Sequence, residues 1–310
     1  MIETSRVNSI LERNYIKKLL KKGARIDGRG LMDYREFRIT TSIVPKAEGS
    51  ADVYLGDTKV IAGVKYDIGA PFGDNPEDGV CTVMSEFIPM AHPDFENGPP
   101  NEYSIQLARV VDRGIRHTNF IDLKKLCIIK GKSCYILFVD IYIADYLGNL
   151  VDASNVAAVA AIVSALLPVG IPDEKGEKAV WDKPKFMQIP VIEFPIAISF
   201  GKLEEFIFID PSIKEEMVMD GAISFAVDGK NNITSIQKFG NATWTLEELE
   251  RCTKIAIEKA NELRQKLNFN QYKREPEEFS KKFMEAHPEL ELPSDAEVVS
   301  GSIIDEDKLL

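Results

Sequence analysis

The fold of this chain is decided by one stretch near its middle, Asp152-Ala-Ser-Asn-Val-Ala-Ala-Val-Ala-Ala-Ile-Val-Ser-Ala-Leu-Leu167. It is almost wholly Ala, Val, Ile and Leu, with polar side chains only near its beginning and at Ser164. A helix that is apolar all round is a buried helix, and its alanines allow it to lie close to a sheet. The stretch is shorter than the roughly 20 residues that a membrane helix needs. It therefore predicts a buried helix over residues 152–167, packed on a sheet.

Strand patterns lie on both sides of this helix. Gly49–Val64 predicts a β-hairpin, because Ala51, Val53 and Leu55 alternate with more polar neighbours and Gly56-Asp57 supplies a tight turn. Further apolar or alternating runs predict strands at Val80–Met90, Leu126–Ile129, Ser133–Ala144, Val191–Phe200, Phe206–Ile209, Gly221–Val227 and Ile233–Phe239.

Helices are predicted at both ends of this strand-rich region. Residues Ser5–Lys22 form an amphipathic pattern that ends before Gly23, and Thr245 is a suitable N-cap for a helix that continues to about Leu267. Pairs of strands alternate with helices along the chain. We therefore expect an α+β fold with sheets covered by helices, rather than a doubly wound parallel sheet.

Composition limits the function classes. The chain has 310 residues, 28% of them charged, and a net charge of −11, which argues against non-specific binding of nucleic acid by the whole surface. The N-terminus lacks an apolar signal core and no stretch is long enough to span a membrane, so we expect a cytoplasmic protein. The four cysteines form no Cys-x-x-Cys pair and there are three histidines, so we predict neither a zinc site nor a cofactor.

A second helix, predicted over Gln106–Arg116, has two faces of opposite character. Arg109, Arg113 and Arg116 share one face at i, i+4 and i+7, opposite a face made by Leu107, Val110, Val111, Gly114 and Ile115. Three guanidinium groups in a row suit a row of phosphates, since each is a planar fork of donors that stays charged. The alternative is a solvated face on which Arg109 or Arg113 pairs with Asp112 or a distant carboxylate.

Several long motifs together resemble a known family. They are Arg25-Ile-Asp-Gly-Arg29, the Gly49–Val64 hairpin, the Leu107–Arg116 helix, Val139–Ser154, and Asp210–Asp220 followed by Ile236-Gln-Lys238. These motifs resemble the RNase PH superfamily, and within it the non-catalytic RNase-PH-like subunits of archaeal exosomes. The resemblance covers roughly Tyr15 to Leu267.

The resemblance implies a fold and an assembly. The fold is RNase PH-like, with two βαβα-like halves whose sheets pack on helices. In the implied assembly the chain pairs with a catalytic RNase-PH-like subunit, and three such heterodimers form a hexameric ring that degrades or tails single-stranded RNA from the 3′ end. RNA-binding cap subunits sit on one face of that ring. The resemblance also places Arg109 at the interface with the catalytic partner, in contact with RNA phosphates, with Arg113 and Arg116 on the same face.

Phosphorolysis needs a phosphate pocket, cations on the scissile backbone and an acid for the leaving oxygen. Active members of the family carry an arginine pair where this chain has Glu102 and Tyr103. Where active members hold phosphate with hydroxyl and arginine residues after a glycine, this chain has Gly148-Asn-Leu-Val-Asp152. Leu150, Val151 and Asp152 are unsuited to binding an anion.

Two further positions point the same way. We assign the acidic cluster of active members to the segment 188–196, where Glu193 is the one carboxylate. The basic loop of active members corresponds to the acidic segment Asp67–Asp78. We therefore predict no catalytic residues and no phosphorolytic activity for the isolated chain.

Three other functions stay open. The chain could be a self-sufficient phosphate-dependent 3′–5′ exoribonuclease, or a structural spacer that never touches RNA. A metal hydrolase using Asp67, Asp74 and Asp78 is a fourth possibility, although that loop contains no His.

The C-terminal part has a different composition. We assign residues 1–272 to the RNase PH-like domain with its N-terminal helix, and residues 273–310 to a flexible acidic tail with eleven acidic and five basic residues. A short helix is predicted around Glu277–Glu285, where Phe279 and Phe283 are four residues apart. These two side chains suit docking on a partner, whereas the alternative is a solvated appendage.

Overall fold

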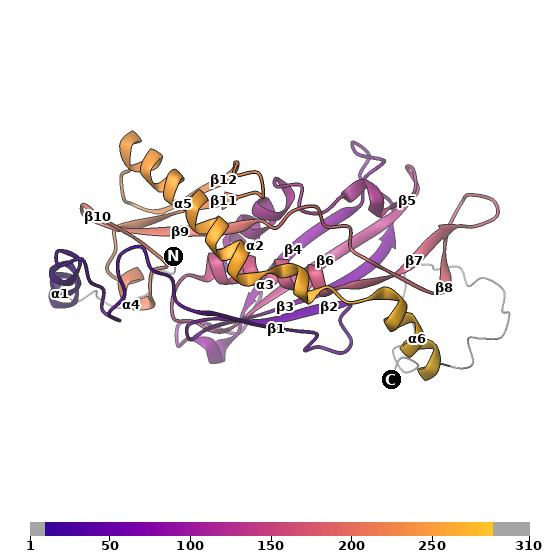
Figure 1. Cartoon of the computed structure of the whole chain (residues 1–310), viewed down its shortest axis with the longest axis horizontal. Helices are drawn as coiled ribbons and strands as arrows, with labels where there is room; N and C mark the ends of the chain where they lie inside the picture. Colours follow the sequence, from indigo (N-terminus) through magenta and orange to yellow (C-terminus); the bar gives the residue numbers. More distant parts are fainter. Residues whose placement is uncertain (1–9, 288–310) are drawn as a thin grey trace.

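The computed structural model describes residues 10–287, in which two sheets share one central helix (Figure 1). The first sheet has the strand order β1-β2-β3-β6-β4, with β5 paired to β6. Its strands are β1 (Phe37–Thr41), β2 (Gly49–Leu55), β3 (Thr58–Gly69), β4 (Val80–Phe87), β5 (Cys127–Ile129) and β6 (Ser133–Asp145). Only β4 runs parallel to its neighbour β6, and α2 (Glu102–Arg116) lies in the connection between them.

The second sheet is antiparallel throughout and has the order β10-β9-β11-β12. It contains β9 (Ile196–Leu203), β10 (Phe206–Ile209), β11 (Gly221–Val227) and β12 (Ile233–Gly240). Helix α5 (Leu246–Leu267) packs on β9 and β11, and α4 (Ile213–Glu216) lies between β10 and β11 in the chain. Short 3-10 helices occur at η1 (Pro89–Ala91), η2 (Leu123–Leu126) and η3 (Phe269–Tyr272). The α+β fold class is confirmed.

Helix α3 (Leu150–Ser164) is the buried helix that the sequence predicts. It packs on β2 and β3 of the first sheet and on β9 of the second, so the two sheets share one apolar core. Its contact with β2 is close, because a Cβ atom on Gly49 would overlap Ala161 O and the Cα of Ala165. The predicted end at Leu167 is wrong. Ala165 is extended and Leu166 begins the next strand, because its amide bonds to Glu48 O instead of continuing the helix.

That next strand, β7 (Leu166–Pro172), pairs with β8 (Ala179–Gln188) in a separate hairpin that the sequence patterns missed. Helix α6 (Pro276–Ala286) packs on β8 (Figure 1). Phe279 and Phe283 lie edge-on against Phe186, with ring centroids 4.8 and 5.2 Å away, and Phe283 also contacts Trp181. The predicted short helix is confirmed. The solvated-appendage alternative is wrong for this helix, while residues 288–310 lie outside the described part of the chain.

Other boundaries differ in small ways from the predictions. The Gly49–Val64 hairpin and the Thr245 N-cap are confirmed. The strand predicted at Val80–Met90 ends at Phe87, because a 3-10 turn begins at Pro89. The strand predicted from Val191 begins at Ile196, after Pro195. None of the helices within residues 10–287 has the length and apolarity needed to cross a bilayer.

The amphipathic pattern of the N-terminal helix α1 (Ile10–Leu20) predicts one apolar face of Ile10, Leu11, Tyr15, Leu19 and Leu20, and this prediction is correct only in part. Ile16 and Leu20 are buried in a second apolar cluster with Phe208 and Met219, whereas Ile10 and Leu11 are more than three-quarters exposed. The predicted part before residue 10 lies outside the described residues. The domain boundary at residue 272 stays a prediction.

Candidate nucleic-acid interface

Helix α2 begins at a side-chain cap and buries the face that the sequence predicts. Asn101 Oδ1 accepts a hydrogen bond of 2.9 Å from Ser104 N, which satisfies one of the free amides of the first turn. The buried side contains Leu107, Val110, Val111, Gly114 and Ile115 and packs on β4 and α3. The helix is therefore held rigidly, and its arginine face is turned outward.

The three arginines of α2 have different surroundings. Arg109 is exposed, and its side chain has neither an ion pair nor a hydrogen bond to any other residue within 10–287. Arg113 is half-buried, and its Nη2 donates to Oε1 of Gln237 on β12 at 2.6 Å. Arg116 pairs with Asp112 one turn before it. The solvated-face alternative thus describes Arg116, while the charges of Arg109 and Arg113 are not neutralised by a partner carboxylate.

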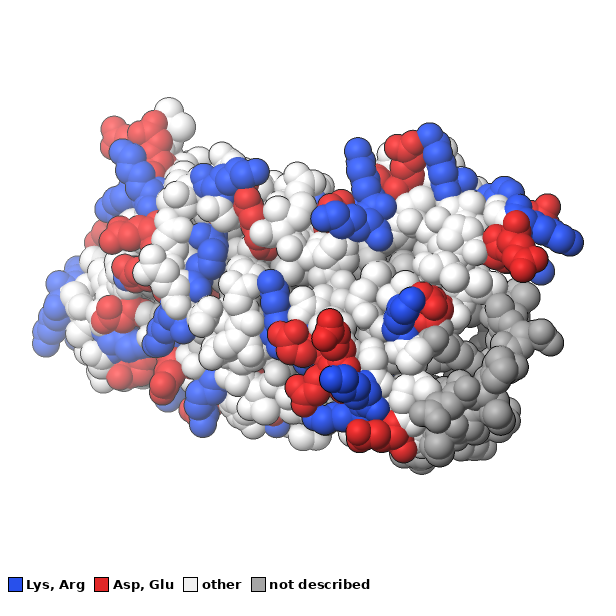
Figure 2. Space-filling model, turned by 45° about the vertical axis from the view of Figure 1, so that its right-hand side comes forward, with Lys and Arg blue, Asp and Glu red and all other residues white. Residues whose placement is uncertain are grey.

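Part of the molecular surface carries mixed charge. On the face shown in Figure 2, Lys and Arg side chains alternate with Asp and Glu instead of forming one broad basic band. Such a surface cannot attract nucleic acid over its whole area. On this face, any phosphate contact is therefore confined to small local groups of cations.

A small pocket lies where the two halves meet, with a cavity volume of about 60 Å³. Its walls come from the beginnings of α2 and α3, the end of β4, α4 and the second sheet, and include Tyr103, Gln106, Asn149, Leu150, Val151, Ser199, Glu216, Ser224 and Phe239. No Lys or Arg of the described chain lines it. Tyr103, Leu150 and Val151, which the resemblance marks as altered positions, are thus brought together at one site.

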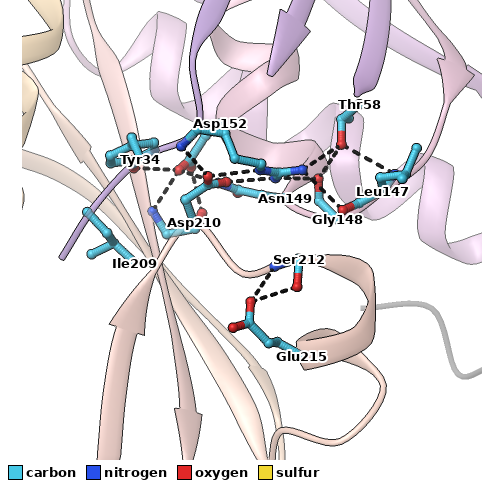
Figure 3. A network of polar contacts seen from close by, with 12 residues as sticks. Tyr34, Thr58, Leu147, Gly148, Asn149, Asp152, Ile209, Asp210, Ser212 and Glu215 are labelled. Carbon is cyan, nitrogen blue, oxygen red and sulfur yellow. Dashed lines mark hydrogen bonds and ion pairs between the residues drawn. The ribbon is translucent and has the colours of Figure 1, made fainter. Parts of the chain in front are cut away.

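Asp152 lies beside this pocket and is fully buried. Its Oδ2 accepts hydrogen bonds from Tyr34 Oη at 2.7 Å and Asn149 Nδ2 at 2.8 Å (Figure 3). Its Oδ1 accepts from Ser199 Oγ at 2.6 Å. Burial raises the pKa of Asp152 to about 6, although these donors oppose the rise. Asp152 therefore joins the first turn of α3 to β9 and makes the site more negative at neutral pH.

A set of ion pairs continues from this aspartate towards the N-terminus. Asn149 Nδ2 also donates to Asp210 Oδ1 at 2.8 Å, and Asp210 pairs with Arg35 and Arg29 at 2.7 Å each. Arg25 pairs with Glu215, and neither side chain is exposed. The Arg25–Arg29 motif, which the sequence shows only as a charged turn, therefore holds the segment between β10 and α4 in place.

The carboxylate that faces the pocket is Glu216, which the sequence reasoning missed. Burial raises its pKa, and it accepts hydrogen bonds from Tyr146 Oη and, at 2.7 Å, from Asn149 N. Glu193 does not line the pocket. It contacts Gly229 N and Lys230 at a turn after β11. An acidic group is therefore present at the site, and the sequence signal for it was the Asp210–Asp220 motif rather than the segment 188–196.

The acidic loop offers no metal centre. Within residues 10–287, no group of three His, Cys, Asp or Glu side chains is arranged to hold a metal ion. Glu77 of this loop pairs with Lys130. The geometry therefore gives no support to the metal-hydrolase hypothesis for Asp67, Asp74 and Asp78.

Two family descriptions match the two halves of this molecule. The 3′ exoribonuclease family, domain 1 (RNase PH), matches residues 33–168, and domain 2 of the same family matches residues 193–259. The chain belongs to this 3′ exoribonuclease family. The first match contains the first sheet with α2 and α3, and the second contains the four-stranded sheet. The resemblance drawn from the sequence motifs is confirmed.

Similar proteins and structures agree with this assignment. The chain is 44% identical to the exosome complex component Rrp42 of Thermococcus onnurineus (strain NA1) over 262 residues, which are 84% of this chain and 96% of that protein. A structure of the Archaeoglobus fulgidus exosome with RNA bound to the active site contains a chain that is 38% identical, with a TM-score of 0.76, covering 83% of this chain and 98% of that one. An archaeal exosome core contains another, 36% identical, with a TM-score of 0.72, covering 83% of this chain and 96% of that one.

Proposed function

We propose that this chain is a non-catalytic ring subunit of an archaeal exosome. It pairs with a catalytic RNase-PH-like subunit, three such pairs close a hexameric ring, and RNA-binding cap subunits sit on one face. Its similarity to Rrp42 components and to chains of archaeal exosome structures, over nearly their whole length, supports this role. We place the complex in the cytoplasm.

The observation that carries the non-catalytic part is the composition of the pocket between the halves. Phosphorolysis requires cations that hold both inorganic phosphate and the scissile phosphate. The described lining offers Tyr103, Leu150 and Val151 instead, with Glu216 facing the pocket and Asp152 close behind it. Because two buried carboxylates repel an anion, the pocket is unsuited to phosphate.

The chain instead positions single-stranded RNA for its partner through Arg109, Arg113 and Arg116. Arg109 is the best placed of the three, because its exposed guanidinium has no competing partner within residues 10–287. Different parts of α2 contribute to the pocket and to the arginine face. Tyr103 and Gln106 belong to its first two turns, and the arginines follow along the helix.

An assay of the purified chain tests this proposal. Incubated with poly(A) and phosphate, the chain alone should release no nucleoside diphosphates, whereas the ring reconstituted with its catalytic partner should release them. Release by the chain alone would favour the alternative, a self-sufficient phosphate-dependent 3′–5′ exoribonuclease.

The spacer hypothesis is separated by Arg109→Glu in the reconstituted ring. Loss of a phosphate contact lowers RNA affinity and makes its dependence on salt less steep. Unchanged affinity and an unchanged salt slope would favour a spacer that never touches RNA.

A further inference from the structure

Two of the α2 arginines have a side-chain partner within the described residues. Gln237, the partner of Arg113, is neutral, whereas Asp112, the partner of Arg116, is charged. Gln237 lies on β12, opposite Ser224 of β11, and its Oε1 accepts the 2.6 Å hydrogen bond from Arg113 Nη2. Its own Nε2 donates to Lys238 O at 3.0 Å. The amide is therefore fixed at both ends and faces the arginine with its oxygen.

This arrangement holds the guanidinium of Arg113 at the contact between α2 and β12. The Nε atom of Arg113 is buried and has no hydrogen-bond partner within the described residues, so the inner end of the guanidinium lies against the protein. One Nη group is engaged by Gln237, and the other remains for a ligand. A fork that is already fixed in place loses less conformational freedom when it binds a phosphate.

The pair Asp112–Arg116, one turn further along the same helix, shows what a charged partner does instead. Asp112 also holds an arginine, but it supplies a full negative charge. A phosphate must compete with that carboxylate. Gln237 fixes Arg113 without this competition, because an amide oxygen carries only a partial charge.

We infer that Gln237 is a positioning residue for RNA: as a neutral acceptor it fixes Arg113 beside Arg109 while leaving the guanidinium charge for a phosphate of single-stranded RNA. The inference rests on the proposed function, since it assumes that the α2 arginines face RNA. It adds a residue on β12, in the second half of the molecule, to the RNA-binding face of the first half.

Gln237→Glu in the reconstituted ring tests the inference. The substitution keeps the shape and the acceptor but neutralises Arg113. The slope of log affinity for a poly(A) oligonucleotide against log salt concentration should become less steep by about 0.7, the share of one phosphate contact on a single strand. Affinity at low salt should fall about tenfold. In an Arg113→Gln background, the same substitution should have a clearly smaller effect, because only the repulsion between the new carboxylate and the RNA remains.

Gln265→Glu is the matched control, because it makes the same chemical change at an exposed position on α5 and should leave the slope unchanged. The mass and melting temperature of the ring show whether each variant assembles. If Gln237→Glu prevents assembly, Gln237→Leu replaces it. Loss of the acceptor should then lower affinity several-fold in the native background and not at all with Arg113→Gln.

The outcomes separate this inference from the proposed function. If Arg109→Glu makes the slope less steep but Gln237→Glu has no effect, or acts equally in the Arg113→Gln background, the positioning role is overturned and the RNA-binding role stands. If neither substitution changes the slope, both are overturned.

Discussion

Two sets of three arginines have opposite surroundings in this molecule. Arg25, Arg29 and Arg35 lie at most one-seventh exposed and each pairs with a fully buried carboxylate, Glu215 or Asp210. On the outer face of α2, the side chain of Arg109 has no partner within residues 10–287, Arg113 has a neutral partner, and Arg116 pairs with the half-buried Asp112. The same residue type thus stabilises structure in one region and presents free charge in the other.

Solvation explains the difference between the two regions. A buried charge is tolerated only when a partner and further hydrogen bonds replace its lost water, so each buried arginine is committed to its carboxylate. An exposed arginine keeps its hydration and needs no partner. Substitutions in the buried set should therefore change stability, and substitutions on the α2 face should change RNA binding.

The largest expected effect is at the buried pair. In the native protein, Arg25 Nε donates to Glu215 Oε1 at 2.8 Å. Glu215→Gln keeps an acceptor oxygen for this hydrogen bond but leaves the charge of Arg25 uncompensated. We expect a loss of about 3–5 kcal/mol in the free energy of unfolding, measured by chemical denaturation. Lys282→Gln, at the exposed i,i+4 pair with Glu278, is the control and should leave the free energy of unfolding almost unchanged. Equal losses for the two variants would contradict the contrast between buried and exposed pairs.

The next effect concerns pH. Because the pKa of Asp152 is raised to about 6 from 3.8, folding favours its protonated form, so its contribution to stability is complete below about pH 4 and is lost as the pH rises to about 6. This loss is about 3 kcal/mol at neutral pH. Asp152→Asn should abolish this loss of stability between pH 4 and pH 7, since a side-chain amide does not titrate in that range.

The hydrogen bonds around residue 152 permit this substitution. The amide oxygen can take the place of Oδ2, which accepts from Tyr34 and Asn149, while the NH₂ group donates to Ser199 Oγ. The Ser199 hydroxyl then donates to Ser224 Oγ, 2.7 Å away. Denaturation curves from pH 4 to pH 7 measure the effect, with Asp182→Asn at a surface pair as control. A wild-type and a D152N profile of the same shape would show that Asp152 is not the titrating group.

The two regions also differ in how far the sequence predicts them. The arginine face of helix α2 follows from a periodicity contained within eleven residues, so its buried side was predicted correctly, although the helix begins at Glu102, four residues before the predicted start. The buried pairs join residues far apart in the chain, such as Arg25 and Glu215 at a separation of 190, and no local pattern shows them. The family motif marked these residues without revealing that they bind each other.

The same reasoning explains why the docking of α6 was not predicted. The composition after residue 272 is acidic and favours a solvated tail. Phe279 and Phe283 nevertheless find partners on β8, a strand that was not predicted because Asp182 and Pro184 interrupt its apolar pattern. An element docked on an unpredicted strand is not visible from its own composition.

The smallest effect is expected at Asp112, the carboxylate that partly neutralises the charge of Arg116. Asp112→Asn removes the carboxylate beside Arg116 and should cost only about 0.3–0.5 kcal/mol of stability, because this is an i,i+4 pair whose arginine is more than half exposed. If Arg116 lies near RNA, the released charge should make the salt slope of RNA binding by the ring steeper by up to about 0.7. Arg116→Gln combined with Asp112→Asn should return the slope to the wild-type value. An unchanged slope in Asp112→Asn would place Arg116 away from the RNA and confine the binding face to Arg109 and Arg113.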